Sequence, residues 1–164
     1  MCPLCFSRIV VAFYSDIERD FYQCTRCWLV FVPPIYYLSL EQEKAHYDLH
    51  QNNPDDLDYR QFLSRLADPL MAKLTIGMSG LDFGSGPGPT LSVMLEESGF
   101  DMAIYDIFYA NDKAVLQIDY DFITATEVVE HLSKPGEVLE NLWLKIKPGG
   151  WLGLMTKMVL DQAA

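Results

Sequence analysis

Short apolar runs fall into two groups along the chain, one near the N-terminus and one after residue 75, with a more polar stretch between them. Residues 9–14 and 21–23 are rich in β-branched and aromatic side chains and flank a polar turn, a pattern that predicts a β-hairpin. Residues 28–32 predict a third strand. It ends at a Pro-Pro pair, because proline cannot donate a ladder hydrogen bond.

The polar stretch covers residues 41–70 and carries seven acidic and three basic side chains. Residues 41–47 predict a short helix, and residues 51–56 predict a turn-rich break. Apolar residues then recur at helical spacing over residues 59–74, which predicts another helix. We expect an interruption near Pro69, because proline removes a backbone donor.

After residue 75, apolar strands alternate with helical patterns. Strands are predicted just before Gly84 and at residues 102–105, 114–118, 122–126 and 151–156. Helices are predicted at residues 91–98, ended by Gly99, and at residues 138–146, followed by a turn over residues 147–150. Strands that alternate with helices are typical of a parallel sheet.

All the cysteines lie in the first 27 residues, as two C-x2-C pairs: Cys2, Cys5, Cys24 and Cys27. Two thiolates on one tight turn can face the same ion, and a second pair completes a tetrahedron. The spacing therefore predicts a structural zinc site in a zinc ribbon over residues 1–40. Two disulfides or four unrelated thiols are the alternatives, and the absence of a secretion signal disfavours the disulfides. Many such turns carry glycine directly after the second cysteine, where this chain has Phe6 and Trp28.

Composition narrows the class of protein further. Of the 164 residues, 50% are hydrophobic and 21% are charged, and the formal net charge is -11. A globular fold is expected, and nucleic acid is disfavoured as a partner because its phosphates repel this charge. No apolar run approaches the roughly 18 residues that span a bilayer. The N-terminus lacks the basic and apolar regions of a signal peptide, so we expect a cytoplasmic protein without membrane contact.

The most informative segment is the pattern D-x-G-x-G-x-G, formed by Asp82, Gly84, Gly86 and Gly88. Glycines let the backbone turn sharply and approach a ligand closely. A dinucleotide fingerprint would need Gly or Ala where Pro89 stands, and a Walker A loop would need a following Gly-Lys-Ser/Thr. Asp106 ends the next predicted strand, where α/β nucleotide sites bind ribose hydroxyls.

Five segments in order resemble the motifs of class I S-adenosylmethionine-dependent methyltransferases: residues 81–88, 105–106, 120–123, 127–132 and 144–150. The resemblance implies that the methionine part of the cofactor is held by Asp82, Phe83, Gly84, Ser85, Gly86 and Gly88. It also implies that Asp106 binds the ribose, that Ile107 lies beside the adenine, and that Thr126 and Glu127 line the site. The cysteine-rich N-terminus is similar to a module that precedes this domain in some bacterial methyltransferases.

The resemblance implies an α/β fold: a Rossmann-like, mostly parallel sheet over residues 71–164, preceded by the zinc ribbon and by residues 41–70 as an acidic linker with helical segments. Only 14 residues separate Asp106 from Asp121, so residues 114–118 are the candidate third strand. Asp119 is the candidate for the acid that contacts adenine. The family has two more strands after the fifth, and natural sheets avoid a bare apolar edge, so we expect a C-terminally truncated domain.

Methyl transfer from a sulfonium requires orientation of two reactants and, for a hydroxyl or amine, removal of a proton. Glu127, Glu130 and His131 stand at i, i+3 and i+4, so they would share one face of a helix. They resemble the segment that holds a divalent metal in ubiquinone-pathway O-methyltransferases and small-RNA 2′-O-methyltransferases. Alternatively, Glu127 contacts cofactor, Glu130 is solvated, and His131 ends the turn or acts as a lone base. His131 and Glu130 are the candidate catalytic residues.

A second pair of candidate ligands, His46 and His50, stands four positions apart. Two surface histidines are the simpler interpretation, and a metal site is the alternative.

The function predicted from these features is S-adenosylmethionine-dependent methylation of oxygen or nitrogen in a small or medium-sized acceptor. An rRNA or tRNA methyltransferase that reads RNA with its ribbon is one alternative. It would need a basic patch, and the ribbon offers only Arg8, Arg19 and Arg26 against three nearby acids. A non-catalytic, cofactor-binding interaction protein is the other. The acceptor and the oligomeric state do not follow from the sequence.

Overall fold

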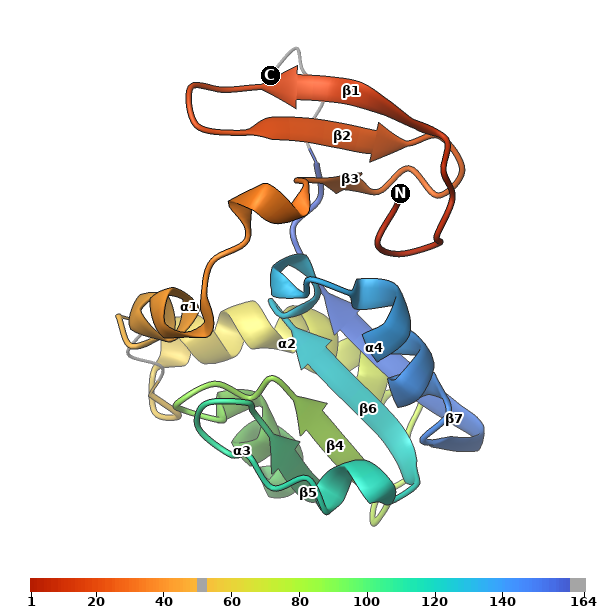
Figure 1. The fold of residues 1–164 in the computed structure, drawn as a ribbon. Helices are drawn as coiled ribbons and strands as arrows, with labels where there is room; N and C mark the ends of the chain where they lie inside the picture. The colour runs from red at the N-terminus through yellow and green to blue at the C-terminus, as the bar shows by residue number, and fades with distance from the viewer. Residues whose placement is uncertain (50–52, 160–164) are drawn as a thin grey trace.

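The computed structural model describes residues 1–49 and 53–159. It contains an antiparallel sheet of three strands in the order β1-β2-β3 and a parallel sheet of four strands in the order β5-β4-β6-β7. The small sheet stands above the α/β layers in Figure 1, next to the chain's N-terminus. None of the helices in the described residues is long and apolar enough to cross a membrane.

The N-terminal sheet confirms the predicted hairpin and third strand. Its strands are β1 (Val10–Ser15), β2 (Asp20–Cys24) and β3 (Val30–Phe31). Val10 lies opposite Cys24, and Tyr22 lies opposite Phe31. This register places the second cysteine pair at the same end of the sheet as the first pair, which lies at the start of the chain. A short 3-10 helix, η1 (Pro34–Tyr36), then leads away from the sheet.

Two helices follow in the acidic stretch, α1 (Leu40–Tyr47) and α2 (Leu57–Met71). Ser39 caps α1, because its hydroxyl accepts a hydrogen bond from the Gln42 N–H and its own N–H donates to the Gln42 side chain. The expected interruption of α2 near Pro69 is wrong, since the helix runs through this residue. Burial of Ala67 and Leu70 compensates for the missing backbone bond. His50 lies outside the described residues.

The parallel sheet confirms the predicted alternation of strands and helices. Its elements are β4 (Ser79–Phe83), α3 (Thr90–Glu97), β5 (Asp101–Tyr105), β6 (Tyr120–Thr126), α4 (Pro135–Trp143) and β7 (Ile146–Met155). Gly99 has a positive φ of 90°, as expected of a residue that ends a helix. The predicted turn at residues 147–150 is the irregular start of β7, with a register shift between its pairs with Tyr120 and Phe122.

Each face of this sheet has its own apolar core. On one face, α2 and α3 pack with Phe122 and with Phe100, which precedes β5, through Leu63, Ala67, Leu70, Leu91 and Leu95. On the other face, Leu142 of α4 packs with Leu81, Tyr120 and Ile123. Figure 1 shows α2 and α3 behind the strands and α4 in front of them. The carboxyl ends of β4, β5 and β6 therefore open between these layers.

The predicted third strand at residues 114–118 is wrong. Val115–Gln117 forms a single 3-10 turn, η2, and within the described residues no strand lies between β5 and β6. Val115 and Leu116 pack against the second core, and the Tyr120 hydroxyl donates a hydrogen bond of 2.8 Å to the Val115 carbonyl. The short connection thus packs Val115 and Leu116 partly against the core without forming a strand.

Candidate functional site

The glycine loop after β4 lies directly against the loop that follows β6. Gly84 and Gly86 have positive φ values of 77° and 68°, a conformation that glycine adopts without strain. A side chain at Gly84 would overlap Val128. The Gly84 N–H donates a 2.7 Å hydrogen bond to the Tyr105 carbonyl at the end of β5. Glycine is therefore required here both for the turn and for the close approach of two loops.

Asp82, the last acid of β4, points into the protein. Its Oδ1 accepts a hydrogen bond of 2.9 Å from the Thr124 hydroxyl of β6, and its Oδ2 accepts one of 3.2 Å from the Ser92 hydroxyl of α3. Burial raises the pKa of this carboxyl to about 6, and the charge of Asp106 adds to the effect. Asp82 thus joins three elements beneath the glycine loop.

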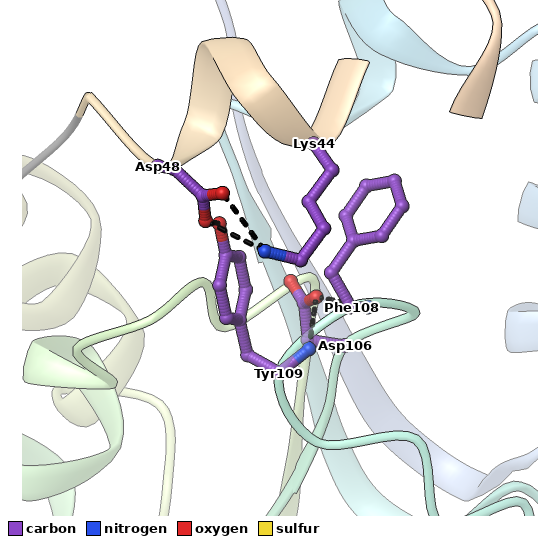
Figure 2. A network of polar contacts seen from close by, with 5 residues as sticks. All are labelled: Lys44, Asp48, Asp106, Phe108 and Tyr109. Carbon is purple, nitrogen blue, oxygen red and sulfur yellow. Dashed lines mark hydrogen bonds and ion pairs between the residues drawn. The ribbon is translucent and has the colours of Figure 1, made fainter. Parts of the chain in front are cut away.

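Asp106 directly follows β5 and connects two loops through backbone N–H groups. Its Oδ2 accepts a hydrogen bond of 3.0 Å from Gly86, and its Oδ1 accepts bonds of 2.8 and 3.1 Å from Phe108 and Tyr109. Figure 2 shows this carboxylate beside the backbone of the loop that carries both aromatic residues. Only 8% of Asp106 is exposed, whereas the adjacent Ile107 is half-exposed.

Two adjoining cavities of about 290 and 250 Å³ open at the carboxyl ends of β4, β5 and β6. The larger cavity is lined by Asp82, Ser85, Gly88 and Thr126, among others. The smaller cavity is lined by Phe83, Asp106, Ile107, Val128, Leu132 and Val138, among others. Both are lined by Tyr47, Gly84, Gly86, Glu127 and His131. Together they have the size and the mixed lining of a site for one extended small molecule.

Two buried hydroxyl groups in the larger cavity lack a partner. Within the described residues, Ser85 Oγ and Thr126 Oγ1 are the buried side-chain oxygens without a hydrogen bond. An unsatisfied buried hydroxyl is costly, and a polar ligand in the cavity would relieve that cost. This side of the larger cavity therefore fits the polar groups of a ligand.

The helical face predicted for Glu127, Glu130 and His131 is wrong. Glu127 follows β6 with a positive φ of 55°, and only Val129–His131 forms a 3-10 turn, η3. Glu127 and His131 line both cavities, whereas Glu130 is exposed and lines neither. In residues 1–49 and 53–159, the cysteines form the one group of three or more potential metal ligands. Among the described residues, Glu127, Glu130 and His131 are therefore not brought together as a group of three metal ligands.

Burial raises the pKa of Glu127, and the negative charge of Glu130 reinforces that effect. A non-glycine residue with this backbone conformation is strained, and such strain is concentrated at functional positions. The Glu127 N–H donates a 2.8 Å hydrogen bond to the Met155 carbonyl of β7, which holds the strained residue in place.

Tyr47 of α1 and Tyr59 of α2 line the larger cavity and were not anticipated from the sequence. Tyr47 packs edge-on against His131 with a ring separation of 5.5 Å and lies 5.9 Å from the Phe108 ring. Burial raises the pKa of both tyrosines, with nearby carboxylates adding to it. The sequence carries little signal for them, since Tyr47 ends a short polar helix and Tyr59 is one of several apolar and aromatic residues in α2.

None of the residues of α1 is buried, so a core contact does not fix this helix. Polar contacts at its C-terminal end hold it over the site instead. Lys44 Nζ lies 2.8 Å from an Asp48 carboxylate oxygen, and the Tyr109 hydroxyl donates a 2.6 Å hydrogen bond to the same residue. The lysine also lies 5.2 Å from the centre of the Tyr109 ring. Figure 2 shows that this cluster links α1 to the loop ordered by Asp106. Lys44 and, less strongly, Tyr109 lower the pKa of Asp48.

The sulfur atoms of Cys2, Cys5, Cys24 and Cys27 all lie within 4.8 Å of one another. The Cys2–Cys27 and Cys5–Cys24 sulfur distances are 3.5 Å, too long for a disulfide of about 2.05 Å. Four thiolates about 2.3 Å from a central zinc would be about 3.8 Å apart, so this donor set fits a tetrahedral ion. The backbone N–H of Cys27 lowers the pKa of Cys24 and favours its thiolate, the form that a metal requires, whereas burial raises the pKa of the Cys27 thiol.

The turns after each cysteine pair have the backbone conformation that glycine usually provides. Phe6 and Trp28 have positive φ values of 59° and 65°. The Phe6 and Trp28 N–H groups donate hydrogen bonds of 3.1 and 2.9 Å to the carbonyls of Cys2 and Cys24. The two turns are therefore closed in the same way despite their bulky side chains.

A comparison with protein families matched residues 51–163 to the family described as methyltransferase domain. A search of curated proteins found none that matches the chain. The matched region contains α2, the whole parallel sheet, the glycine loop, Asp106 and η3, whereas α1 and the cysteine cluster lie outside it. The family match and the four-stranded parallel sheet support the same assignment: this chain belongs to the methyltransferase-domain family and has the fold of a class I methyltransferase.

Proposed function

We propose that the protein is an S-adenosylmethionine-dependent methyltransferase whose cofactor occupies the two adjoining cavities. The observation that carries this proposal is the carboxylate of Asp106, the residue after β5, which accepts a hydrogen bond from the Gly86 N–H of the glycine loop. Acids at this position of an α/β sheet bind ribose hydroxyls. The unpartnered hydroxyls of Ser85 and Thr126 lie on the other side of the same loop and suit the methionine moiety.

The residues divide between the two parts of the cofactor. Asp82 supports the glycine loop around the methionine part, where Gly84, Gly86 and Gly88 leave the backbone open to the ligand. Phe83, Ile107 and Leu132 provide apolar contacts for the adenine in the smaller cavity. When bound, the cofactor supplies an electrophilic methyl group on a sulfonium. The protein orients the acceptor and removes its proton.

His131 is the proposed proton acceptor, since it lines both cavities. Its imidazole is oriented by the edge-on contact with Tyr47. Glu127 lines the same cavities and, with its raised pKa, is a second group able to accept a proton. Glu130 lines neither cavity and acts on Glu127 through its charge.

The acceptor is proposed to be small or medium-sized and to react through oxygen or nitrogen. The two cavities are bounded by α1 and by η3, and the net charge of -11 opposes RNA. The four cysteines are proposed to hold a structural zinc ion, since four thiolates leave no open position for a substrate.

Calorimetric titration with S-adenosylhomocysteine tests the cofactor site. Wild type is expected to bind with a micromolar dissociation constant, and Asp106→Ala is expected to abolish binding. Asp101→Ala is the matched control, because this acid is exposed at the opposite end of the same strand. Absence of binding by the folded, zinc-loaded wild type would overturn the proposal.

A second assay identifies the class of acceptor. Cell extract is incubated with the protein and a methyl-labelled cofactor, and label is then counted separately in small-molecule, RNA and protein fractions. Label in the small-molecule fraction is expected. Label confined to RNA would replace the proposed acceptor with RNA, and absence of label despite cofactor binding would favour a non-catalytic protein.

A further inference from the structure

A short segment after η3 connects the cofactor cavities to the first cysteine turn. His131 and Leu132 line the smaller cavity. The next residue, Ser133, accepts a 3.4 Å hydrogen bond at its carbonyl from the Tyr37 hydroxyl. Gly136 donates a 3.1 Å hydrogen bond from its N–H to the Pro3 carbonyl. One end of this segment therefore faces the ligand site, and the other end faces the cysteine turn.

The contact at Gly136 is a close approach between two backbones. A Cβ atom there would overlap the Leu4 carbonyl oxygen and would lie 3.0 Å from Cζ of Phe6. Gly136 lies in the first turn of α4, and its φ is not in the positive range, so alanine would suit the helix itself. Glycine is thus needed at this position for the cysteine turn and not for the helix.

The shape of that turn depends on the cysteine cluster. Pro3 and Leu4 lie between Cys2 and Cys5, whose sulfur atoms point to the shared centre. The turn is closed by the Cys2 N–H bond to Ser7 and the Phe6 N–H bond to Cys2, of 2.9 and 3.1 Å. A bound ion would hold the two carbonyls that face α4 in this arrangement, and its loss would release them.

We propose that the first cysteine turn positions the segment from His131 to Gly136, so that metal binding at the cysteines and cofactor binding in the cavities stabilise each other. This inference rests on the proposed function, because it takes the cavities as the cofactor site. Neither the cysteine turn nor Tyr37 belongs to the region matched by the methyltransferase-domain family. The coupling is therefore a property of this chain's N-terminal part.

Thermodynamic linkage makes the test reciprocal. If zinc raises the affinity for the cofactor by some factor, the cofactor must raise the affinity for zinc by the same factor. Zinc affinity is measured by competition with a chromogenic chelator, with and without saturating S-adenosylhomocysteine. The affinity of zinc-loaded and metal-free protein for S-adenosylhomocysteine is measured by calorimetry. We expect a change of about fivefold in both, within the usual range of coupling between sites.

Three variants locate the coupling. Two ratios measure the coupling: the zinc affinity with and without S-adenosylhomocysteine, and the S-adenosylhomocysteine affinity with and without zinc. Gly136→Ala is expected to bring both ratios close to one, and circular dichroism checks that its helices remain. Tyr37→Phe removes only the hydroxyl that bonds Ser133 and is expected to reduce the ratios by about half. Tyr36→Phe is the matched control, because this neighbouring hydroxyl bonds Asp20 within the ribbon. Its ratios are expected to equal those of wild type.

The failures of the two proposals are distinguishable. Wild type that binds S-adenosylhomocysteine with the same affinity in the presence and absence of zinc overturns the coupling and leaves the methyltransferase proposal intact. A protein that binds S-adenosylhomocysteine but no zinc also overturns the coupling and leaves the methyltransferase proposal intact. Folded wild type that binds zinc but no S-adenosylhomocysteine overturns both.

Discussion

Asp82 and Asp106 are acids at or near the carboxyl ends of neighbouring parallel strands, but their surroundings give them different roles. Asp82 has hydroxyl partners from inside the protein, whereas Asp106 accepts backbone N–H groups from two loops beside a cavity. Substitution of Asp82 should therefore change stability, and substitution of Asp106 should change ligand binding.

We predict that Asp82 makes the protein less stable as pH rises from about 4 to about 6. Its pKa is raised in the folded state to about 6, so the folded protein holds a proton that the unfolded chain releases. The free energy of unfolding contributed by this group falls across that window and is constant above it. Compared with Asp82→Asn, wild type should lose on the order of 3 kcal/mol between pH 3.5 and pH 7.

Urea unfolding at each pH measures this difference. Asp68→Asn, on the exposed side of α2, is the control and should follow the wild-type curve. Parallel curves for wild type and Asp82→Asn would contradict the prediction.

A pair of glycine substitutions separates backbone strain from steric overlap. Gly77 and Gly84 have positive φ values of 86° and 77°, so alanine at either should cost about 1–2 kcal/mol of stability. No atom lies within 4 Å of a side chain at Gly77, whereas one at Gly84 would overlap Val128. Gly84→Ala should lose additional stability and more than tenfold in S-adenosylhomocysteine affinity, and Gly77→Ala should keep that affinity. Equal affinities, measured by calorimetry, would contradict this prediction.

Among the elements, α2 shows how a helix predicted from spacing obtains its role from packing. The recurrence of apolar residues predicted the helix, and its buried residues Leu63, Ala67 and Leu70 pack on α3 and the sheet. Gly153 of β7 leaves room for this contact, because a Cβ there would lie 3.3 Å from Leu66. This packing brings Tyr59 to the cavity wall.

We predict that Leu70→Ala lowers the free energy of unfolding by about 3 kcal/mol, the usual cost of a cavity in a core. Leu57→Ala is the matched control on the same helix, where 78% of the side chain is exposed. It should change stability by less than about 0.5 kcal/mol. Urea unfolding measures both, and similar losses would mean that α2 does not belong to the core.

The segment between β5 and β6 shows the limit of local patterns. A largely apolar run predicted a strand at residues 114–118, but Val115 and Leu116 are half-buried by a single turn of 3-10 helix. A short apolar run carries little information on conformation, because burial can be achieved by either structure. A short pattern was equally uninformative at η3, where Glu127, Glu130 and His131 have helical spacing but the chain forms only a 3-10 turn.

For the whole molecule, we predict that removal of zinc unfolds the small sheet while the parallel sheet remains folded. Cys24 is the one buried residue of these three strands, and Cys2 is buried in the turn beside them, so metal binding would supply most of their stability. Hydrogen exchange at residues 10–15 and 20–24 should accelerate after chelation, and exchange in β4 and β6 should change little. Chelator presaturated with zinc is the control, and protection of the small sheet in metal-free protein would contradict the prediction.

Much of the candidate site could be predicted from the sequence because its residues belong to contiguous motifs. Short sequence patterns identified the glycine loop, Asp106 and the cysteine pairs. The structure places five of the predicted residues around the same two cavities: Asp82, Gly84, Asp106, Thr126 and Glu127. Tyr47 and Tyr59 could not be predicted, because they reach the cavities through the packing of α1 and α2.

The order of strands and helices, the two cysteine turns and the glycine loop followed from local spacing, since each depends on residues a few positions apart. Four features did not follow from local spacing: the orientation of Asp82, the strained backbone of Glu127, the position of α1 over the cavities and the contact between Gly136 and Pro3. They arise where segments far apart in the chain meet, and the energies of such contacts depend on distances that only the assembled layers set. The chemistry of the site was thus encoded locally, and its geometry came from packing.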